Sequence, residues 1–329
     1  MAAKTSVFVG TVGEGVWRSE DAGETFARRS AGMFMESDVR ALAVHPRNPA
    51  ALYAGTNAGL YRTGDGGENW QRLAGPFDPG QGWPGGVIIW SLLVHPQQPE
   101  TLFVGTCPPA LYRSQDGGAS WQKLDAELPE CPPLIHSRVT CLLADPNDAD
   151  TIWAGVEIGG VWRSRDGGHH WESLSEGLSS QDIHGLAILP GSPRRLLAST
   201  NNDLNLSTDE GATWQPQNVK AVFPHAYCRG IQAKADDPNT LFLGNGDGPP
   251  GSTGVLQISR DGGLTWERAN LPTTPNSTIW TFATNAAAPD LIFAASVSGD
   301  LYRSDDGGNA WAKCRREFGE IRSLALAVS

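Results

Sequence analysis

Arginine, tryptophan, histidine and acidic residues recur at equivalent places in this 329-residue sequence, at the start of short apolar segments. Alignment of seven such segments on their apolar residues places at one position Arg40, Trp90, Thr140, His184, Arg229, Trp280 and Arg322. Two residues earlier stand Asp38, Ile88, Arg138, Asp182, Tyr227, Thr278 and Glu320. A planar guanidinium binds a carboxylate or phosphate with two parallel hydrogen bonds, and an indole offers a stacking face. These residues therefore suit a small anionic or polyhydroxylated ligand that carries a ring.

The candidate residues divide into binding and catalytic groups. The candidate ligand-binding residues are Arg40, Trp90, Arg138, Arg229, Trp280 and Arg322. The candidate catalytic residues are Asp38, Asp182, His184, Tyr227 and Glu320, with Glu157 as a further carboxylate. Two carboxylates beside a sugar can act as acid and base, so the set favours a hydrolase or lyase slightly over a protein without activity. In the alternative interpretation, arginine and acid pair with each other, for example Arg40 with Asp38 or Glu320, and hold the scaffold in register.

Three histidines outside the repeated pattern support a weaker hypothesis. His136, His184 and His225 precede or begin consecutive apolar segments, and three imidazoles from neighbouring loops could hold a divalent metal with one place open to water. Otherwise one histidine acts as an acid, a base or a hydrogen-bond donor to the ligand. No cofactor is required by the sequence. Cys228, between Tyr227 and Arg229, is either a nucleophile or, as we favour, a small filler.

The elements that must position these residues belong to an internal repeat. Its core is Ser/Thr-x-Asp-x-Gly-x-x-Trp/Phe, as in "SQDGGASW", with the aspartate at Asp21, Asp65, Asp116, Asp166, Asp209, Asp261 and Asp306. Successive separations of 44, 51, 50, 43, 52 and 45 residues match the ~40–50 of propeller blades. Aspartate bonded to nearby backbone and glycine at positive φ predict a hairpin turn between two strands, with the tryptophan packed over it.

Two further strands precede each of these boxes. In the second repeat they are predicted at 39–44, the innermost, and at 51–55. The sequence therefore predicts an all-β fold: a seven-bladed propeller of four antiparallel strands per blade, in one domain over 1–329. The segment 320–328 should complete the blade begun at the N-terminus and close the ring. The first-strand starts should then encircle one opening, on the face away from the box turns.

These motifs resemble the Asp-box, or BNR, repeat family over essentially the whole chain. The family includes sialidases, xyloglucan-degrading enzymes, sortilin-type receptors and a photosystem II assembly factor, so the resemblance implies the propeller but no single function. It also implies that the boxes are structural. A sialidase is disfavoured because the first inner strand lacks an Arg-Ile-Pro stretch and no separate Tyr–Glu pair stands out. Xyloglucan-degrading members use two facing propellers, and this chain supplies one.

The composition of the chain limits the classes of partner that it is expected to bind. The net charge of −11 argues against nucleic acid or an anionic membrane as the main partner, and no apolar run reaches the length of a membrane-spanning helix. No signal-peptide pattern and five irregularly spaced cysteines favour a soluble cytoplasmic protein. A small molecule is the expected partner. The rival hypothesis is a platform that binds a protein or peptide through the Gly/Pro-rich loops "NGDGPPGSTG" and "AGPFDPGQGWPGG".

Overall fold

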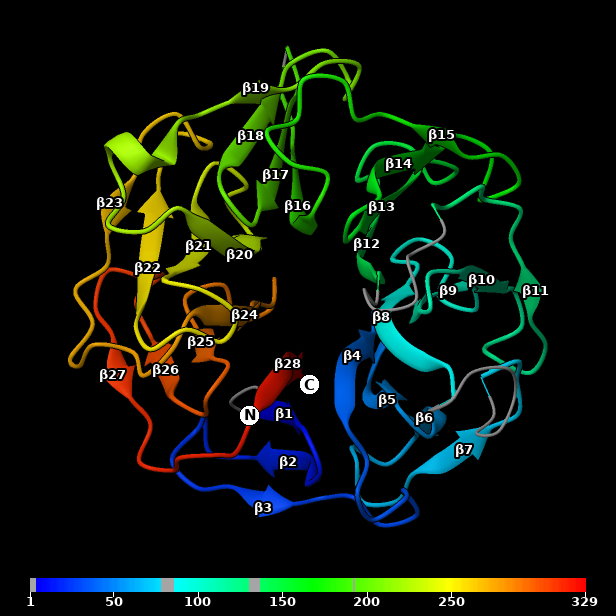
Figure 1. Cartoon of the computed structure of the whole chain (residues 1–329). Helices are drawn as coiled ribbons and strands as arrows, with labels where there is room; N and C mark the ends of the chain where they lie inside the picture. Colours follow the sequence, from blue (N-terminus) through cyan, green and yellow to red (C-terminus); the bar gives the residue numbers. More distant parts are fainter. Residues whose placement is uncertain (1–3, 78–85, 130–136, 192) are drawn as a thin grey trace.

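Seven four-stranded antiparallel sheets surround a common centre, which confirms the predicted fold (Figure 1). The structure is a computed structural model that describes residues 4–77, 86–129, 137–191 and 193–329. Within these ranges the single helical element is a short 3-10 turn, η1 (Val219–Ala221). Abundant glycine and short runs of β-branched and aromatic residues between turns account for the many short strands.

Each blade contributes one strand to each of four rings, from the centre outward. The innermost strands are β28 (Ile321–Val328), β4 (Val39–His45), β8 (Ile88–Val94), β12 (Val139–Ala144), β16 (Ile183–Leu189), β20 (Tyr227–Ala233) and β24 (Ile279–Ala283). The second are β1 (Thr5–Thr11), β5 (Asn48–Thr56), β9 (Leu102–Cys107), β13 (Ile152–Val156), β17 (Arg195–Thr200), β21 (Leu241–Gly246) and β25 (Ile292–Ser296). The third are β2 (Gly15–Ser19), β6 (Gly59–Thr63), β10 (Leu111–Ser114), β14 (Gly160–Ser164), β18 (Leu204–Ser207), β22 (Gly254–Ser259) and β26 (Leu301–Ser304). The outermost are β3 (Ala27–Arg28), β7 (Gln71–Leu73), β11 (Gln122–Lys123), β15 (Glu172–Ser173), β19 (Gln215–Pro216), β23 (Glu267–Arg268) and β27 (Ala312–Lys313).

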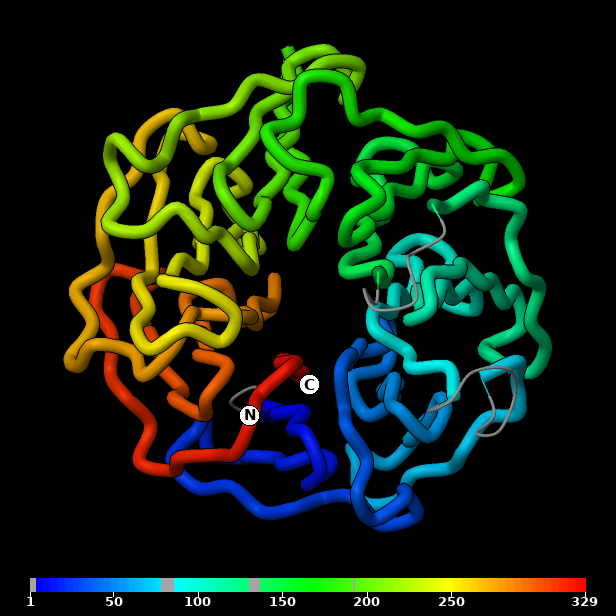
Figure 2. Tube along the Cα trace, viewed as in Figure 1, coloured from blue at the N-terminus to red at the C-terminus, as the bar shows by residue number. Residues whose placement is uncertain are grey.

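The ring closes where the last strand pairs with the first. β28 runs antiparallel to β1, with Thr5 opposite Val328 and Val9 opposite Leu324, so the first blade is β28-β1-β2-β3. Figure 2 shows these red and blue ends of the chain side by side near the centre. This pairing confirms the predicted closure of the ring.

The Asp boxes form the same hydrogen-bonded turn in every blade. In the first, the Ser19 hydroxyl donates to Asp21 at 2.7 Å, the Gly23 amide donates to that hydroxyl, and the Thr25 amide donates to the Asp21 carboxylate at 2.9 Å. Equivalent bonds recur in the other six boxes. Their carboxylates are thus committed to backbone and hydroxyl groups of their own turns.

The core consists of apolar clusters between neighbouring blades. One cluster joins Phe103 of β9 to Val139 and Leu142 of β12, and the others repeat this arrangement around the ring. The boxes also contribute to the contacts between neighbouring blades. A Cβ on Gly168, two residues after the box aspartate, would lie 3.0 Å from the Phe103 ring of the preceding blade. The constant glycine therefore serves both the turn and the fit between blades.

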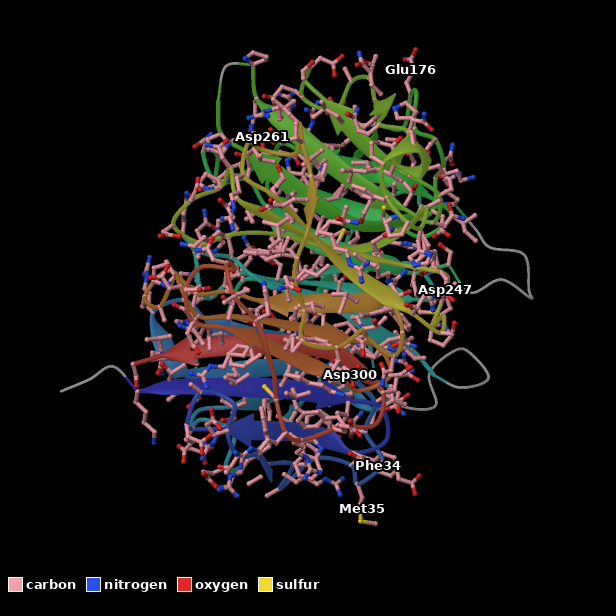
Figure 3. The ribbon with its side chains drawn as sticks, turned by 90° about the vertical axis from the view of Figure 1, so that its left-hand side faces the viewer. Phe34, Met35, Glu176, Asp247, Asp261 and Asp300 are labelled. Atoms are coloured by element: carbon pink, nitrogen blue, oxygen red, sulfur yellow. The ribbon has the colours of Figure 1, made fainter. Side chains whose placement is uncertain are left out.

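The strand directions give the molecule two different faces. We call the face that carries the box turns the bottom face, and the opposite one, where the innermost strands begin, the top face. In Figure 3 the box residue Asp261 lies toward the left, whereas Asp247 and Met35, from connections on the top face, lie toward the right. The predicted opposition of box turns and inner-strand starts is confirmed by this arrangement.

Candidate functional site

A β-bulge interrupts the innermost strand of every blade at the position singled out by the sequence alignment. The register shifts between Val39 and Ala41 in β4, for example, so that Arg40 has no partner residue in β5. The same irregularity occurs in the other six blades. The residues it leaves unpaired include Arg40, Trp90, Thr140, His184, Arg229, Trp280 and Arg322. A bulge turns its side chain away from the sheet's regular alternation, and all seven of these side chains line one cavity of about 280 Å³ in the central channel.

A second, larger cavity of about 590 Å³ opens beside the channel and is lined by residues from the blades of β12, β16, β20 and β24. It is lined by Arg138, Glu157, Asp182, His184, Asn201, His225, Ala226, Tyr227, Arg229, Gly246, Asp247, Gly248, Pro249 and Trp280. His184, Arg229 and Trp280 line both cavities. The structure thus brings three predicted catalytic residues, Asp182, His184 and Tyr227, together in one hollow.

His184 is the most constrained of these groups. Its Nδ1 lies 2.7 Å from the Cys228 carbonyl oxygen, which can only accept, so Nδ1 carries the hydrogen. Its Nε2 lies 3.3 Å from Oδ1 of Asp182, and its ring centroid lies 4.9 Å from that of Tyr227. The side chain of His184 is only 2% exposed, whereas that of Asp182 is 18% exposed. Strands β16 and β20 therefore fix the imidazole from two sides.

The environment sets the charges of this group. Burial, followed by the charge of Arg229, lowers the pKa of His184. Burial alone would raise the pKa of Asp182, but the contact with His184 and the charges of Arg229 and Arg138 together lower it. Burial raises the pKa of Tyr227. At neutral pH the cavity therefore presents a neutral imidazole, an ionised carboxylate and a protonated phenol.

Arg229 is a buried cation without a carboxylate partner. It is 4% exposed, and no carboxylate within the described ranges approaches its guanidinium to 4.0 Å. The guanidinium carbon lies 3.8 Å from the centroid of Trp280. A buried charge is costly unless it is paired, so this residue is suited to receive an anion.

The remaining arginines each hold a carboxylate. Arg138 forms two hydrogen bonds with Glu157, which lies on the connection from β13 to β14. Arg40 contacts Asp38 at 2.9 Å, and Arg322 pairs with Glu320, as the alternative interpretation expected. Asp38 and Glu320 line neither of the two cavities. The structure thus separates these two candidate catalytic residues from Asp182, His184 and Tyr227.

Both tryptophans of the ring are covered by guanidinium groups. Arg40 and Arg138 lie 4.7 and 4.1 Å from the centroid of Trp90. Arg229 and Arg322 lie 3.8 and 4.5 Å from that of Trp280. The stacking surface expected of the two indoles is occupied by arginine in this structure.

The metal hypothesis stays a prediction. His136 lies outside the described residues, as does Trp83 of the "AGPFDPGQGWPGG" loop. His225 lines the larger cavity, but both ring nitrogens of His184 already face protein atoms. Over the described ranges, no three His, Cys, Asp or Glu residues are placed to hold a metal ion. Burial raises the pKa of the Cys228 thiol to about 12, which leaves it protonated and matches its interpretation as a filler.

Sequence reasoning missed two polar residues of the larger cavity, Asn201 and Asp247. Asp247 belongs to the insertion "NGDGPPGSTG", which the rival hypothesis assigned to a protein partner. Its carboxylate accepts hydrogen bonds from the Ser252 amide and hydroxyl and from the Thr253 amide. An aspartate followed by serine and threonine in a Gly/Pro-rich loop indicates such a self-bonded turn, and that signal could have identified it.

Comparison with known proteins finds two family models that match parts of the chain, and relatives of low identity. A sortilin-type model (Sortilin, neurotensin receptor 3) matches residues 14–150, and the BNR/Asp-box repeat model matches residues 257–268. A probable oligoxyloglucan-reducing end-specific xyloglucanase of Neosartorya fischeri is 27% identical over 268 residues, 78% of this chain and 31% of that protein. Xyloglucanase Xgh74A of Acetivibrio thermocellus is 27% identical over 305 residues, 83% of this chain and 32% of that protein. The chain spans about a third of the length of these relatives.

Solved structures resemble the fold. The GH74 xyloglucanase from Xanthomonas campestris matches with a TM-score of 0.64 and 19% identity, over 86% of this chain and 45% of that one. YCF48 bound to D1 peptide matches with a TM-score of 0.54 and 18% identity, over 83% and 80%. Among the residues described here, no helix is long and apolar enough to cross a membrane. The chain is a seven-bladed β-propeller with repeated Asp boxes, and it is similar to the BNR/Asp-box repeat and sortilin-type families.

Proposed function

We propose that the protein binds a small anionic or polyhydroxylated ligand in the 590 Å³ cavity and acts on it as a glycoside hydrolase-like enzyme. The observation that carries the proposal is Arg229: a buried guanidinium without a carboxylate partner, in the same cavity as Asp182, His184 and Tyr227. An anionic group of the ligand would supply the missing charge, and two charge-assisted hydrogen bonds would orient it. The xyloglucanase relatives support a carbohydrate as the ligand class.

The charges of the cavity give each group a role. Asp182 is ionised and can accept a proton from water or from the ligand. Tyr227 keeps its proton and can donate to the atom that becomes negative. The same base, placed beside an anion bound to Arg229, could remove a proton as a lyase does. Hydrolysis and this lyase reaction would use the same residues and would differ in their products.

Binding is tested by calorimetric titration of the whole chain with glucuronate, a ring-bearing anionic sugar. Arg229→Gln should weaken binding at least ~10-fold, because a lost bidentate charge pair corresponds to at least about 1.4 kcal/mol. Arg165→Gln is the matched control, because Arg165 lies in a box and its side chain is 62% exposed. Equal affinity of wild type and Arg229→Gln would remove the proposed anion site.

Catalysis is tested with 4-nitrophenyl β-glucuronide, from which hydrolysis releases 4-nitrophenol. Asp182→Asn should lower kcat by ~10²–10⁴ while leaving KM within a few-fold, since it removes a proton acceptor and not the anion site. Binding without release of nitrophenol or of an unsaturated product would restrict the protein to a binding role.

One observation favours a second candidate, a peptide-binding platform. Phe34 and Met35, on the top-face connection between β3 and β4, are 53% and 73% exposed. A propeller of similar fold, YCF48, is described as bound to D1 peptide. The double variant Phe34→Ser/Met35→Ser should then lose binding to an immobilised peptide library while keeping its affinity for glucuronate. Retained binding to the library would remove this candidate.

A further inference from the structure

Two opposite charges line the larger cavity without pairing with each other. Arg229 is buried, and within the described ranges no carboxylate lies within 4.0 Å of its guanidinium. In the same ranges no arginine or lysine lies within 4.0 Å of Asp182, whose contact is with Nε2 of His184 at 3.3 Å. Among these residues, no group donates a hydrogen bond to the buried Oδ1 of Asp182. The cavity therefore presents an unpaired cation and an unpaired anion.

Each of these two charges is supported by a ring. The guanidinium carbon of Arg229 lies 3.8 Å from the centroid of Trp280, on the neighbouring strand β24. The carboxylate of Asp182 lies against the imidazole of His184, whose Nδ1–H donates to the Cys228 carbonyl at 2.7 Å. The neutral imidazole turns its unprotonated nitrogen to Asp182, so it supplies neither a hydrogen nor a charge. The two charges are thus fixed on separate supports before a ligand arrives.

The other arginine and carboxylates of the cavity are already satisfied within the protein. Arg138 donates two hydrogen bonds to Glu157. The carboxylate of Asp247 accepts three hydrogen bonds from Ser252 and Thr253. Neither of these pairings needs a ligand, so the charge that a ligand must match is that of Arg229 and Asp182.

A ligand with both charges would match this pair better than an anion alone. A carboxylate would accept two hydrogen bonds from the guanidinium of Arg229, and an ammonium group would donate to the carboxylate of Asp182. A monoanion satisfies only the first of these two charges and brings its own negative charge close to the second. Because an unpaired charge in a partly buried site is costly, a ligand that pairs both removes two costs instead of one.

We propose that the larger cavity binds a ring-bearing zwitterion of the amino sugar acid class, with its carboxylate on Arg229 and its ammonium group on Asp182. The inference rests on the proposed function, because it uses the same anion site, and it names the class of ligand. Trp280 is a positioning residue for Arg229. The substrate 4-nitrophenyl β-glucuronide carries no ammonium group, so its KM does not report on the second contact.

The test compares three sugars that differ in charge. Glucuronate carries the carboxylate, glucosamine carries the ammonium group, and 2-amino-2-deoxyglucuronate carries both. In calorimetry of the whole chain at pH 6.5 and one ionic strength, the zwitterion should bind at least ~10-fold more tightly than either of the others. The N-acetylated form, 2-acetamido-2-deoxyglucuronate, keeps an N–H but loses the positive charge, and it should bind no more tightly than glucuronate.

Variants assign the two contacts. Asp182→Asn should remove the advantage of the zwitterion over glucuronate and leave the affinity for glucuronate within about threefold, because only the ammonium contact loses its charge. Arg229→Gln should remove the advantage of the zwitterion over glucosamine. Asp290→Asn is the matched control, since the side chain of Asp290 is 69% exposed, and it should change none of the three affinities.

The role of the indole has its own readout. Trp280→Leu should weaken glucuronate and the zwitterion to a similar degree and leave glucosamine unchanged, because it removes the support of Arg229 alone. Trp280→Phe keeps an aromatic face and should restore most of the loss. A merely structural role would weaken all three sugars together.

Three outcomes decide the matter. Tighter binding of the zwitterion that disappears in Asp182→Asn and on N-acetylation supports the paired site. Binding of the zwitterion no tighter than that of glucuronate, or an advantage that survives in Asp182→Asn or on N-acetylation, overturns the paired site and leaves the proposed anion site in place. No binding of glucuronate or of the zwitterion to the wild type overturns the proposed function and the paired site together.

Discussion

At the scale of single residues, the chemistry of the cavity depends on the protonation state of one buried imidazole. The Cys228 carbonyl selects the Nδ1–H form of His184, and the low accessibility of the ring disfavours its cation. Asp182 then faces Nε2, which is the unprotonated nitrogen at neutral pH. The charges of Arg229 and Arg138 lower the pKa of Asp182 and so favour an ionised carboxylate beside this nitrogen.

This arrangement predicts the titration of His184. Nitrogen-15 NMR should show an Nδ1–H neutral imidazole with a pKa below its ordinary value of 6.5, because burial and Arg229 oppose the cation. Since the unfolded chain binds a proton first, the contribution of His184 to stability is present above pH 6.5 and lost as the pH falls. His184→Gln identifies the signal. A pKa of His184 above 6.5 would show that the attraction of Asp182 for the cation outweighs burial and the charge of Arg229. It would then contradict the assignment of a neutral imidazole.

At the scale of elements, two devices recur in every blade: the box turn and the inner-strand bulge. The box turn carries the Asp network and a glycine at positive φ that contacts the preceding blade. Arginines of the third strands add a second link, for Arg113 and Arg163 donate to the carbonyls of Gly167 and Glu210 in the boxes of the following blades. The boxes are thus joints between sheets, which explains why they stay constant while the top of the ring varies.

A substitution at one joint tests this interpretation. Gly168 has a φ of +94°, and an added Cβ would lie 3.0 Å from Phe103 and 3.2 Å from Leu124. Gly168→Ala should lower the free energy of unfolding by about 1–3 kcal/mol, measured by urea denaturation. In the matched control Gly64→Ala nothing lies within 4 Å, and we expect a change below about 0.5 kcal/mol. Equal effects of the two substitutions would contradict the interpretation that Gly168 forms part of the contact between blades.

At the scale of the whole molecule, the seven boxes make stability depend on pH in a common direction. Hydrogen bonds from neighbouring hydroxyl and amide groups lower the pKa of Asp21, Asp116 and Asp209 from 3.8 to about 2. Asp65 is lowered to about 2, most strongly by the Asn69 amide, and the other box aspartates shift in the same direction.

The expected result is loss of stability in acid, in a defined window. Because the folded pKa is depressed, the unfolded chain binds more protons, so the contribution is complete above about pH 4 and lost as the pH falls toward 2. The midpoint of urea denaturation should fall through this window. Asp116→Asn should flatten that fall relative to wild type, and an unchanged slope would show that the box carboxylates do not carry it.

The sequence predicted the blades because the box repeats at regular intervals and because the apolar runs between boxes are short. It also predicted that Arg40, His184, Arg229 and Trp280 meet, since equivalent positions of equivalent strands must face one axis. The sequence did not predict the bulges, because a local irregularity of the backbone does not require particular residue types. The pairing of Arg322 with Glu320 and the stacking of arginine on Trp90 depend on side-chain reach across the ring, which strand alignment does not give.

The bulge frees one side chain in each blade from the pairing that holds the sheet together. Exchanging such a residue alters no backbone pairing of the sheet and no contact at a box. Seven positions can therefore change one at a time, and a propeller built in this way can acquire a new ligand before it acquires a new shape.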